Sequence, residues 1–455
     1  MSGGIQPLRV DAAGRLLTKE DGTPFFWLGD TAWELFHKLN REDAEQYLRV
    51  RAAQSFNVIQ AVLLAEFEGA TTGNAYGSKP LAIEADGRID PANPDDDGEY
   101  SYWDHADYII RLAGELGIYI ALLPTWGDKF NRLWGKGPEI FTPDNAYAYG
   151  RWLGTRYRDQ PNVVWVLGGD RPLHTRRHFD IVGRMAQGLK DGDNGKHLMT
   201  FHPSGGISSS LYVHDEPWLD FNMIQSSHDI GERTNYKLVE SDYARLPVKP
   251  TLDAEPCYED IPRGFQADNG YFDEADVRKA AYYAVFAGAF GHTYGHHSVW
   301  SMSDGAYASV AFEEPGAFFI MDWKTALRRP GAEQMRHLRS LMESRDTVGR
   351  MPDQELIAGN ASGSNYMVAT RGANYGWIYS PNGLAIRAAT GKLAGTRLRA
   401  SWFCPRTGAF IALGEFDRAE DRSFAPPTSG RGQDWVLCLD WTERNIDLNA
   451  YHRRD

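Results

Sequence analysis

The sequence predicts a (β/α)8 TIM barrel followed by a small all-β antiparallel sandwich domain. Eight short apolar runs, seven of them followed by a stretch of helical periodicity, are typical of parallel strands joined by crossover helices. The first apolar run ends in LGDTAW, not in the G-x-G-x-x-G loop that often marks a doubly wound open sheet. Beyond residue 350, short alternating runs are broken by Gly, Pro and Asn. We therefore expect a catalytic barrel over 1–350 and a β-sandwich over 351–455.

Each expected barrel strand is a short apolar run, and seven of the eight are followed by a clear helical pattern. The expected strands are 24–30, 57–64, 118–126, 162–170, 197–203, 221–228, 249–256 and 291–297. The expected helices are 41–54, 102–117, 143–159, 174–190, 235–246, 273–290 and 331–344. The segment 204–220 is the weakest unit because its helix is short or absent, and 65–100 reads as a long loop.

Charge and hydropathy exclude several classes of protein. A formal net charge of −13 argues against a general nucleic-acid binder, which needs a basic surface. No apolar run approaches the ~20 residues needed to cross a bilayer, so we expect no membrane partner. The start MSGGIQPLRV has no signal-peptide pattern, which predicts a cytoplasmic protein, or a periplasmic or secreted one if a signal was removed. The oligomeric state is not indicated.

Two carboxylates stand at the expected carboxyl ends of strands, where barrel active sites form. Asp170 ends the fourth strand, NVVWVLGGD, and Glu255 ends the seventh, KPTLDAE. Strands four and seven face each other across a barrel, so these acids can flank one sugar. Glycosidic bond cleavage needs one acid to protonate the leaving oxygen and a second carboxylate to attack or to activate water. We therefore expect a carbohydrate substrate, no cofactor, and a structural salt bridge as the alternative role for either acid.

Aromatic, histidine and amide side chains at the same strand ends are expected to orient sugar hydroxyls and cover ring faces. The candidate substrate-binding residues are Asp30, Trp33, Trp126, Arg171, His202, Gln225, His228, Tyr294, His296, His297 and Trp300. Arg171 has a second interpretation, in which it pairs with a neighbouring carboxylate and stabilises the rim.

Two further motifs have structural alternatives. GHTYGHH (291–297) is rich in histidine, but strand one lacks the His-x-His of metal-dependent amidohydrolases and no H-E-x-x-H is present. We expect no catalytic metal, although a metal-dependent hydrolase remains an alternative, as does a barrel that binds carbohydrate without turnover. Asp104 and His105 look catalytic, but they open a helix on the side away from the site. We expect Asp104 to stabilise that helix terminus.

Four stretches together resemble a known family. PFFWLGDTAWELFHKLNREDAEQYLRVRAAQSFNVIQAVLL, YWDHADYIIRLAGELGIYIALLPTWGDK, NVVWVLGGDRP and KPTLDAEPCYE are similar to the apiosidase-like catalytic domain of glycoside hydrolase family 140. The likeness covers about 7–350, and the last 100 residues resemble the collagen-binding-type β domain that follows it. The resemblance implies a TIM barrel of the large retaining glycosidase clan, with Asp170 as acid/base and Glu255 as nucleophile.

The resemblance also implies a substrate, and one departure from the wider clan. The family's characterised activity is release of apiose from a pectic side chain, which implies a role in pectin degradation and carbohydrate metabolism. In the clan, the acid/base is usually a Glu after an Asn, whereas here Asp170 follows Gly169. Aspartate is one methylene shorter, so we expect retention but the stereochemical outcome stays open. Adjacent glycines allow the backbone to come closer to the sugar.

Overall fold

The computed structural model describes residues 4–305, 319–393 and 395–442, and the barrel is present as expected. The eight strands are β4 (Trp27–Thr31), β5 (Val58–Leu64), β8 (Tyr119–Thr125), β9 (Val163–Gly168), β10 (Met199–His202), β12 (Asn222–Gln225), β13 (Thr251–Asp253) and β14 (Gly291–Tyr294). Each lies within or within one residue of its expected range. The predicted fold class, a TIM-type barrel followed by an antiparallel β domain, is confirmed.

The strands form one curled sheet in the order β10-β9-β8-β5-β4-β14-β13-β12-β11, parallel except for β11 (Ile207–Ser208). The sheet closes between β10 and β12 through Thr200 Oγ1, which donates to the Phe221 carbonyl at 2.6 Å, and through the Asp220 amide, which donates to Met199. Because every neighbouring pair is parallel, the carboxyl ends of the eight strands meet at one mouth.

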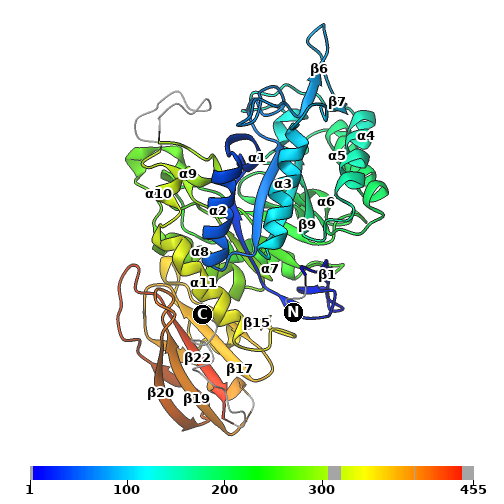
Figure 1. Cartoon of the computed structure of the whole chain (residues 1–455). Helices are drawn as coiled ribbons and strands as arrows, with labels where there is room; N and C mark the ends of the chain where they lie inside the picture. Colours follow the sequence, from blue (N-terminus) through cyan, green and yellow to red (C-terminus); the bar gives the residue numbers. More distant parts are fainter. Residues whose placement is uncertain (1–3, 306–318, 394, 443–455) are drawn as a thin grey trace.

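Helices surround the sheet in the expected sequence (Figure 1). They are α2 (Arg41–Ala53), α3 (Tyr102–Glu115), α4 (Pro143–Tyr157), α5 (Arg176–Asp193), α6 (Ser210–Val213), α7 (Tyr236–Tyr243), α8 (Glu274–Phe286) and α11 (Pro330–Glu343). The unit after β10 carries only the single turn α6, as expected. Asp104 forms a capping box with Ser101 at the start of α3, which confirms its structural role. None of the helices in the described ranges is long and apolar enough to cross a membrane.

Helices α4 and α5 flank β9 and pack unusually close together. Their backbones meet at Gly150 and Gly154 of α4 and at Gly188 and Gly192 of α5. A Cβ at Gly154 would lie 2.3 Å from the Leu189 carbonyl oxygen, and one at Gly188 would lie 2.2 Å from that of Tyr147. Only glycine permits this approach. The two glycines four residues apart on each helix therefore allow the close contact of α4 with α5.

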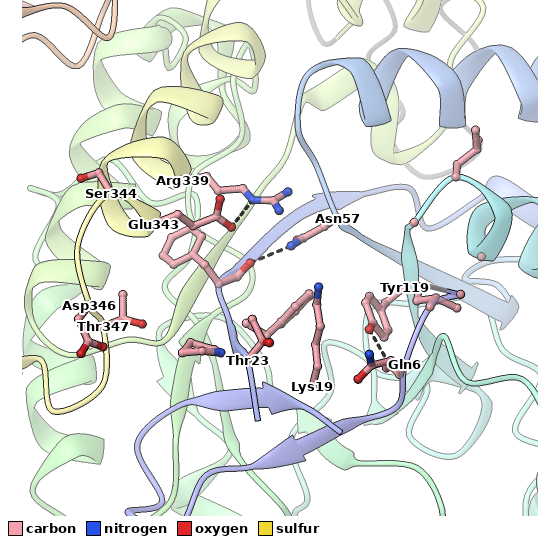
Figure 2. A pocket seen from close by; sticks show the side chains of 18 of the residues that line it. Gln6, Lys19, Thr23, Asn57, Tyr119, Arg339, Glu343, Ser344, Asp346 and Thr347 are labelled. Atoms are coloured by element: carbon pink, nitrogen blue, oxygen red, sulfur yellow. Dashed lines mark hydrogen bonds and ion pairs between the residues drawn. The ribbon is translucent and has the colours of Figure 1, made fainter. Parts of the chain in front are cut away.

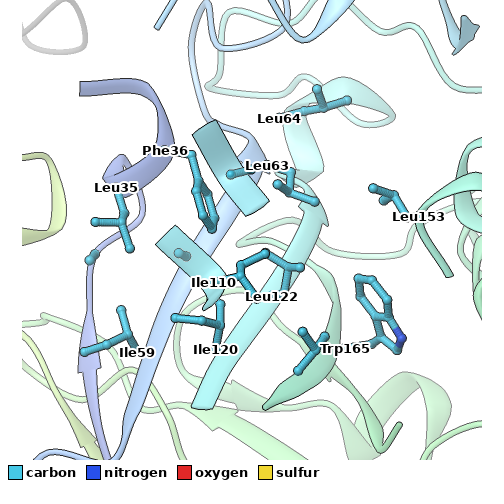
Figure 3. Close-up of a cluster of buried hydrophobic side chains, with 14 of the residues drawn as sticks. Leu35, Phe36, Ile59, Leu63, Leu64, Ile110, Ile120, Leu122, Leu153 and Trp165 are labelled. Carbon is cyan, nitrogen blue, oxygen red and sulfur yellow. The ribbon is translucent and has the colours of Figure 1, made fainter. Parts of the chain in front are cut away.

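Two apolar layers hold the barrel. The outer faces of the strands pack against the helices, with Ile59, Leu63 and Ile120 meeting Phe36 and Ile110 (Figure 3). The barrel interior contains a second cluster that includes Trp27, Val62, Val166, Met223 and Leu252. Burial on both faces explains why the strands read as nearly continuous apolar runs.

Several elements were not expected from the sequence. A three-stranded sheet of β1 (Leu8–Val10), β2 (Leu17–Lys19) and β3 (Pro24–Phe25) precedes the barrel. The 65–100 segment contains the hairpin β6 (Leu81–Ile83) and β7 (Ile89–Pro94). The short helices are α1 (Leu35–Lys38), α9 (His297–Trp300) and α10 (Trp323–Ala326). These elements contain two to six residues each, too few for a periodic signal.

The C-terminal domain is antiparallel, as expected. Its main sheet has the order β15 (Met351–Pro352), β16 (Val368–Arg371), β17 (Tyr375–Ser380), β22 (Trp435–Trp441), β19 (Arg397–Phe403) and β20 (Phe410–Asp417). A second layer of β18 (Ile386–Ala388) and β21 (Arg422–Phe424) packs on it through a shared core. Cys404 and Cys438 are buried and free. Residues 443–455 of the expected second domain lie outside the described residues.

The β domain and the barrel share one hydrophobic core at α8 (Figure 1). Tyr282 stacks on Tyr379 with ring centroids 4.8 Å apart, and Phe286 packs on Trp377. Beside them, the buried guanidinium of Arg278 donates to Asp434 at 2.9 Å. Because α8 lies between β13 and β14 in the chain, the β domain stabilises the helix that supports two strands of the barrel mouth.

We expect Trp377→Ala to lower the free energy of unfolding by about 3–5 kcal/mol, because it opens a cavity in this shared core. Thermal unfolding followed by calorimetry should show one transition at a lower temperature. Ile411→Ala, on the exposed strand β20, is the control and should change stability by less than about 0.5 kcal/mol. If the barrel of Trp377→Ala unfolded at the wild-type temperature, the two domains would unfold independently of each other.

Candidate active site

A cavity of about 530 Å³ opens at the carboxyl ends of the barrel strands. It brings together both candidate acids, Asp170 and Glu255, and six of the candidate substrate-binding residues. Those six are Trp33, Trp126, Gln225, His228, His297 and Trp300. The other residues that line it are Glu66, Phe67, Trp134, Lys136, Gly205, Ser227, Tyr258, Ile261 and Phe265.

The end of β9 has an uncommon backbone conformation. Gly168, Gly169 and Asp170 all have positive φ, at 90°, 109° and 53°. A Cβ at Gly168 would lie 2.3 Å from the His202 carbonyl oxygen, so glycine is required by space as well as by conformation. The Gly169 amide donates to that same carbonyl at 3.1 Å. The turn therefore lies against β10 and delivers the Asp170 carboxyl to the cavity.

The surroundings of Asp170 favour its protonated form. Burial and the negative charge of Glu255 raise the pKa of Asp170 to about 6, although Arg171, His202 and Gln225 act in the opposite direction. The carboxyl therefore retains its proton at a higher pH than an exposed aspartate does. A raised pKa beside a second acid is the pattern that distinguishes a general acid from its partner.

Glu255 has the opposite character. Burial alone would raise its pKa, but the contacts of His202 and His228 outweigh burial and hold the pKa of Glu255 well below its usual range. His202 Nε2 lies 2.7 Å from Oε2, although the ring is not aligned for a straight hydrogen bond, and His228 Nε2 lies 3.2 Å from Oε1. The carboxylate is thus kept ionised while only 5% exposed.

His202 connects the two acids. Its Nδ1 accepts the Asp170 amide at 3.3 Å, so Nε2 carries the proton that faces Glu255. The ring lies edge-on to Trp33, with centroids 5.4 Å apart, and 5.6 Å from Trp126. His202 is fully buried and lies beneath the cavity wall, where it contacts the Asp170 amide and the Glu255 carboxylate but does not line the space itself.

Besides Glu255 Oε2 and the Tyr258 hydroxyl, three buried polar atoms of cavity-lining residues lack a hydrogen-bond partner among the described residues. They are Gln225 Oε1, His228 Nδ1 and Trp126 Nε1. Each is buried, and an unpaired buried polar atom costs about 1–3 kcal/mol. The cavity therefore presents two acceptors and one donor in fixed positions, which suits a ligand with several hydroxyl groups.

Arg171 is fully buried and bridges two acids, as its second interpretation predicted. Its Nη1 donates to the Asp170 carbonyl at 2.8 Å and to Asp170 Oδ2 at 3.1 Å, and its Nη2 donates to Glu66 at 2.9 Å. Its guanidinium carbon lies 4.3 Å from the ring centroid of Trp134. Arg171 does not line the cavity, so we do not retain it as a substrate contact.

Three other candidate substrate-binding residues point away from the cavity. Asp30 forms a buried salt bridge with Arg51 of α2 at 2.6 Å, and the Tyr294 hydroxyl donates to Glu259 at 2.6 Å. His296 Nε2 lies 3.0 Å from Asp260. The reason is strand alternation: Gly29 and Thr293 face the barrel interior, so Asp30 and Tyr294 face the helices. Tyr294 and His296 thus hold the loop after β13, and Asp30 holds α2.

Sequence reasoning missed most of the upper wall of the cavity. Trp134 and Lys136 lie in the loop after β8, and Phe265 lies in the loop after β13. Tyr258, three residues after Glu255, packs on His228 with centroids 4.5 Å apart. A strand-end search finds only the first residues of each loop, such as Glu66 after β5 and Ser227 after β12.

The histidines of β14 and its loop have separate environments. His292 is buried behind the strand, His296 pairs with Asp260, and His297 stacks on Phe319 with centroids 4.4 Å apart. Across the described ranges, no group of three or more His, Cys, Asp or Glu side chains could hold a metal ion. The geometry therefore gives the metal-dependent alternative no donor set there.

A larger cavity, of about 1080 Å³, lies at the opposite end of the barrel. It is lined by the N-terminal sheet, by the starts of β5 and β8 and by the end of α11, with Lys19, Tyr119 and Arg339 among its side chains (Figure 2). Glu343 accepts from Arg339 at 2.8 Å, and Tyr119 donates to the Gln6 carbonyl. This cavity contains neither Asp170 nor Glu255 and lies away from the carboxyl ends of the strands.

Comparison with known proteins agrees with this geometry. Residues 11–348 match the family model described as "Apiosidase-like, catalytic domain", and residues 351–440 match "Putative collagen-binding domain of a collagenase". No curated protein matches the chain. A solved structure of a glycoside hydrolase family 5 protein from Bacteroides vulgatus ATCC 8482 is 34% identical, with a TM-score of 0.88 over 98% of this chain and 95% of that one. Another, named "Glycoside hydrolase", is 34% identical, with a TM-score of 0.84 over 97% and 98%.

We expect Gly168→Ala to lower the free energy of unfolding by about 2–5 kcal/mol, because it combines a positive φ with a steric clash. Gly195→Ala is the matched control: its φ is 66°, but no atom lies within 4 Å of an added Cβ. It should cost only about 1–2 kcal/mol. Equal losses in denaturant titrations would show that the contact with His202 does not constrain the turn.

Proposed function

The chain belongs to the family of apiosidase-like catalytic domains and is a glycoside hydrolase, and we propose that it uses Asp170 and Glu255 to hydrolyse its substrate with retention of configuration. The observation that carries this assignment is the opposite shift of the two acids. The pKa of Asp170 is raised to about 6 while that of Glu255 is lowered. One acid thus keeps a proton to give and the other keeps a charge with which to attack.

In the first step, Glu255 attacks the anomeric carbon while the glycosidic C–O bond breaks. Asp170 transfers its proton to the departing oxygen, and a glycosyl ester on Glu255 results. His228 and His202 support the ionised form of Glu255 before the attack. Gln225 and His228 have open polar atoms for the sugar hydroxyls, and Trp33, Trp126 and Trp300 line the space for the ring.

In the second step, Asp170, now ionised, accepts a proton from a water molecule. The water oxygen attacks the anomeric carbon, the ester bond to Glu255 breaks, and the sugar leaves with its original configuration. The Arg171 guanidinium, bonded to the Asp170 carboxyl, stabilises the negative charge that Asp170 carries between the two steps.

We propose pectic oligosaccharides of plant type as substrates, with apiose as the released sugar. This assignment depends on the resemblance to glycoside hydrolase family 140. A cavity of about 530 Å³ suits a short oligosaccharide better than a long chain. The test is a screen of pectic and other plant oligosaccharides, in which proton NMR identifies the anomer of the first product. An inverted first product would overturn retention, and binding without any turnover would favour the binding-only barrel.

Replacing either acid with its amide should abolish turnover without unfolding the protein. We expect Glu255→Gln to lower kcat by at least ~10³-fold, since no ester can form. Asp170→Asn should cost about 10²–10⁴-fold on a natural oligosaccharide, and less on a glycosyl fluoride, whose leaving group needs no proton. Asp180→Asn, a partly exposed acid on α5, is the control. Retained turnover in both folded amide variants would eliminate the assignment.

The pH dependence should follow the proton on Asp170. Because its pKa is raised to about 6, the protonated form is present below that pH and is lost as pH rises through it. We therefore expect kcat/KM for an oligosaccharide to fall about tenfold per pH unit above this value. Formation of the glycosyl ester from the glycosyl fluoride needs no proton from Asp170, so kcat/KM for the fluoride should not show this fall. A kcat/KM for the oligosaccharide that stays flat to pH 9 would contradict the role of Asp170 as acid.

A further inference from the structure

We propose that Trp134 is a stacking platform for the departing sugar and that it determines which leaving groups the enzyme accepts. This inference rests on the proposed function of Asp170 as the acid. The acid protonates the oxygen that joins the two sugars, so that oxygen lies within hydrogen-bond reach of Asp170. The sugar that departs with the oxygen must then extend past Asp170, and the residues beyond Asp170 form its binding site.

Trp134 lies beyond Asp170 and is built into the same network. Arg171 bonds the Asp170 carboxyl, and its guanidinium carbon lies 4.3 Å from the centroid of the Trp134 ring. Trp134 lines the cavity yet is 62% exposed, the largest exposed fraction among the aromatic side chains in the described ranges. One face of the indole thus covers the guanidinium while the opposite side of the residue remains accessible.

The loop that carries Trp134 is held in place before any ligand binds. The Gly135 amide donates to the Arg132 carbonyl at 2.6 Å, and the Gly137 amide donates to Asp128 at 3.0 Å. Asn131 anchors the loop to the Pro172 carbonyl at 2.8 Å, next to Arg171. A Cβ at Gly135 would lie 2.6 Å from Arg171 Nη2, so glycine is needed for the loop to reach the guanidinium. A fixed ring loses little entropy when a sugar stacks on it.

The cavity wall is divided in the way this proposal requires. Glu66, Phe67, Trp134 and Lys136 come from the loops after β5 and β8, which flank the Asp170 network. Ser227, His228, Tyr258, Ile261 and Phe265 come from the loops after β12 and β13, on the side of Glu255. Within the described part of the chain, Lys136 forms no hydrogen bond or ion pair with other side chains, which leaves its ammonium group to donate to oxygens of the departing sugar.

The alternative role of Trp134 is to shield the ion pairs of Arg171 from water. Shielding needs one face of the ring only, and it would affect every reaction that uses Asp170 equally. A platform for a sugar affects only reactions in which a sugar occupies that side. This difference can be measured in one experiment.

The experiment uses a glycosyl fluoride and a disaccharide that carry the same glycosyl group, chosen among wild-type substrates from the oligosaccharide screen. The free sugar released from the disaccharide serves as acceptor. Transfer to that acceptor and hydrolysis by water both need Asp170 as base, so their ratio cancels any change in its acidity. We expect Trp134→Ala to lower the transfer-to-hydrolysis ratio by about 10- to 100-fold, and kcat/KM for the disaccharide by at least as much.

Two variants control for disturbance of the loop. Leu133→Ala removes the neighbouring side chain, which is 47% exposed and does not line the cavity, and should leave the ratio within twofold of wild type. Trp134→Phe keeps an aromatic face and should restore most of the ratio. An unchanged ratio in Trp134→Ala would overturn the platform and favour shielding.

The proposed function fails in a different way from the platform. If the wild type hydrolyses no glycoside, both proposals are overturned. If the wild type inverts configuration and transfers nothing to the acceptor, the retaining mechanism is wrong. The role of Trp134 is then tested by comparing how much Trp134→Ala lowers kcat/KM for the disaccharide and for the glycosyl fluoride. A selective loss on the disaccharide would support the platform, and equal losses on both substrates would overturn it.

Discussion

The buried guanidinium of Arg171 is the interaction on which the catalytic end of the barrel depends. It joins the loop after β5 through Glu66, the end of β9 through Asp170, and the loop after β8 through Trp134. A guanidinium with no access to water is stable only when carboxylates and carbonyls surround it, so these three loops must converge on it. Gly127 and Gly135 leave the space: a Cβ at either would lie 2.6 Å from an Arg171 side-chain atom.

The same charge balance separates the two acids. Asp128 pairs with Lys129, and Glu66 shares Arg171 with Asp170, while Glu255 has two histidines of its own. Burial raises the pKa of Glu66 to about 8 despite its bond to Arg171. Near neutral pH, Glu66 therefore adds little negative charge beside Asp170. Glu255 is ionised throughout this range, whereas Asp170 keeps its proton only up to about pH 6. Different neighbours thus give two carboxyl groups of one cavity opposite pKa shifts, which is what the proposed mechanism requires.

Much of this architecture could be predicted from the sequence, because apolar runs and glycine positions report burial directly. The eight strands, the weak fifth unit and the two acids are all local signals of this kind. The direction of a strand-end side chain is not, because Asp30 and Thr31 are adjacent and face opposite sides. The sequence signal for the direction of Asp30 lies in α2, where Tyr47 and Arg51 are one turn apart and both bond Asp30. Trp134 escaped notice since it lies nine residues beyond its strand, in a loop without periodicity.

The position of His202 between the two acids has a consequence for how the site responds to motion. One imidazole ring accepts the amide of Asp170 and touches the carboxylate of Glu255. The two acids follow β9 and β13, on opposite sides of the barrel. Without a shared contact, relative motion of these two strands would move one acid independently of the other. A single rigid ring in contact with both makes such displacements correlated. Through this one histidine ring, the backbone at the end of β9 is coupled to the Glu255 carboxylate after β13.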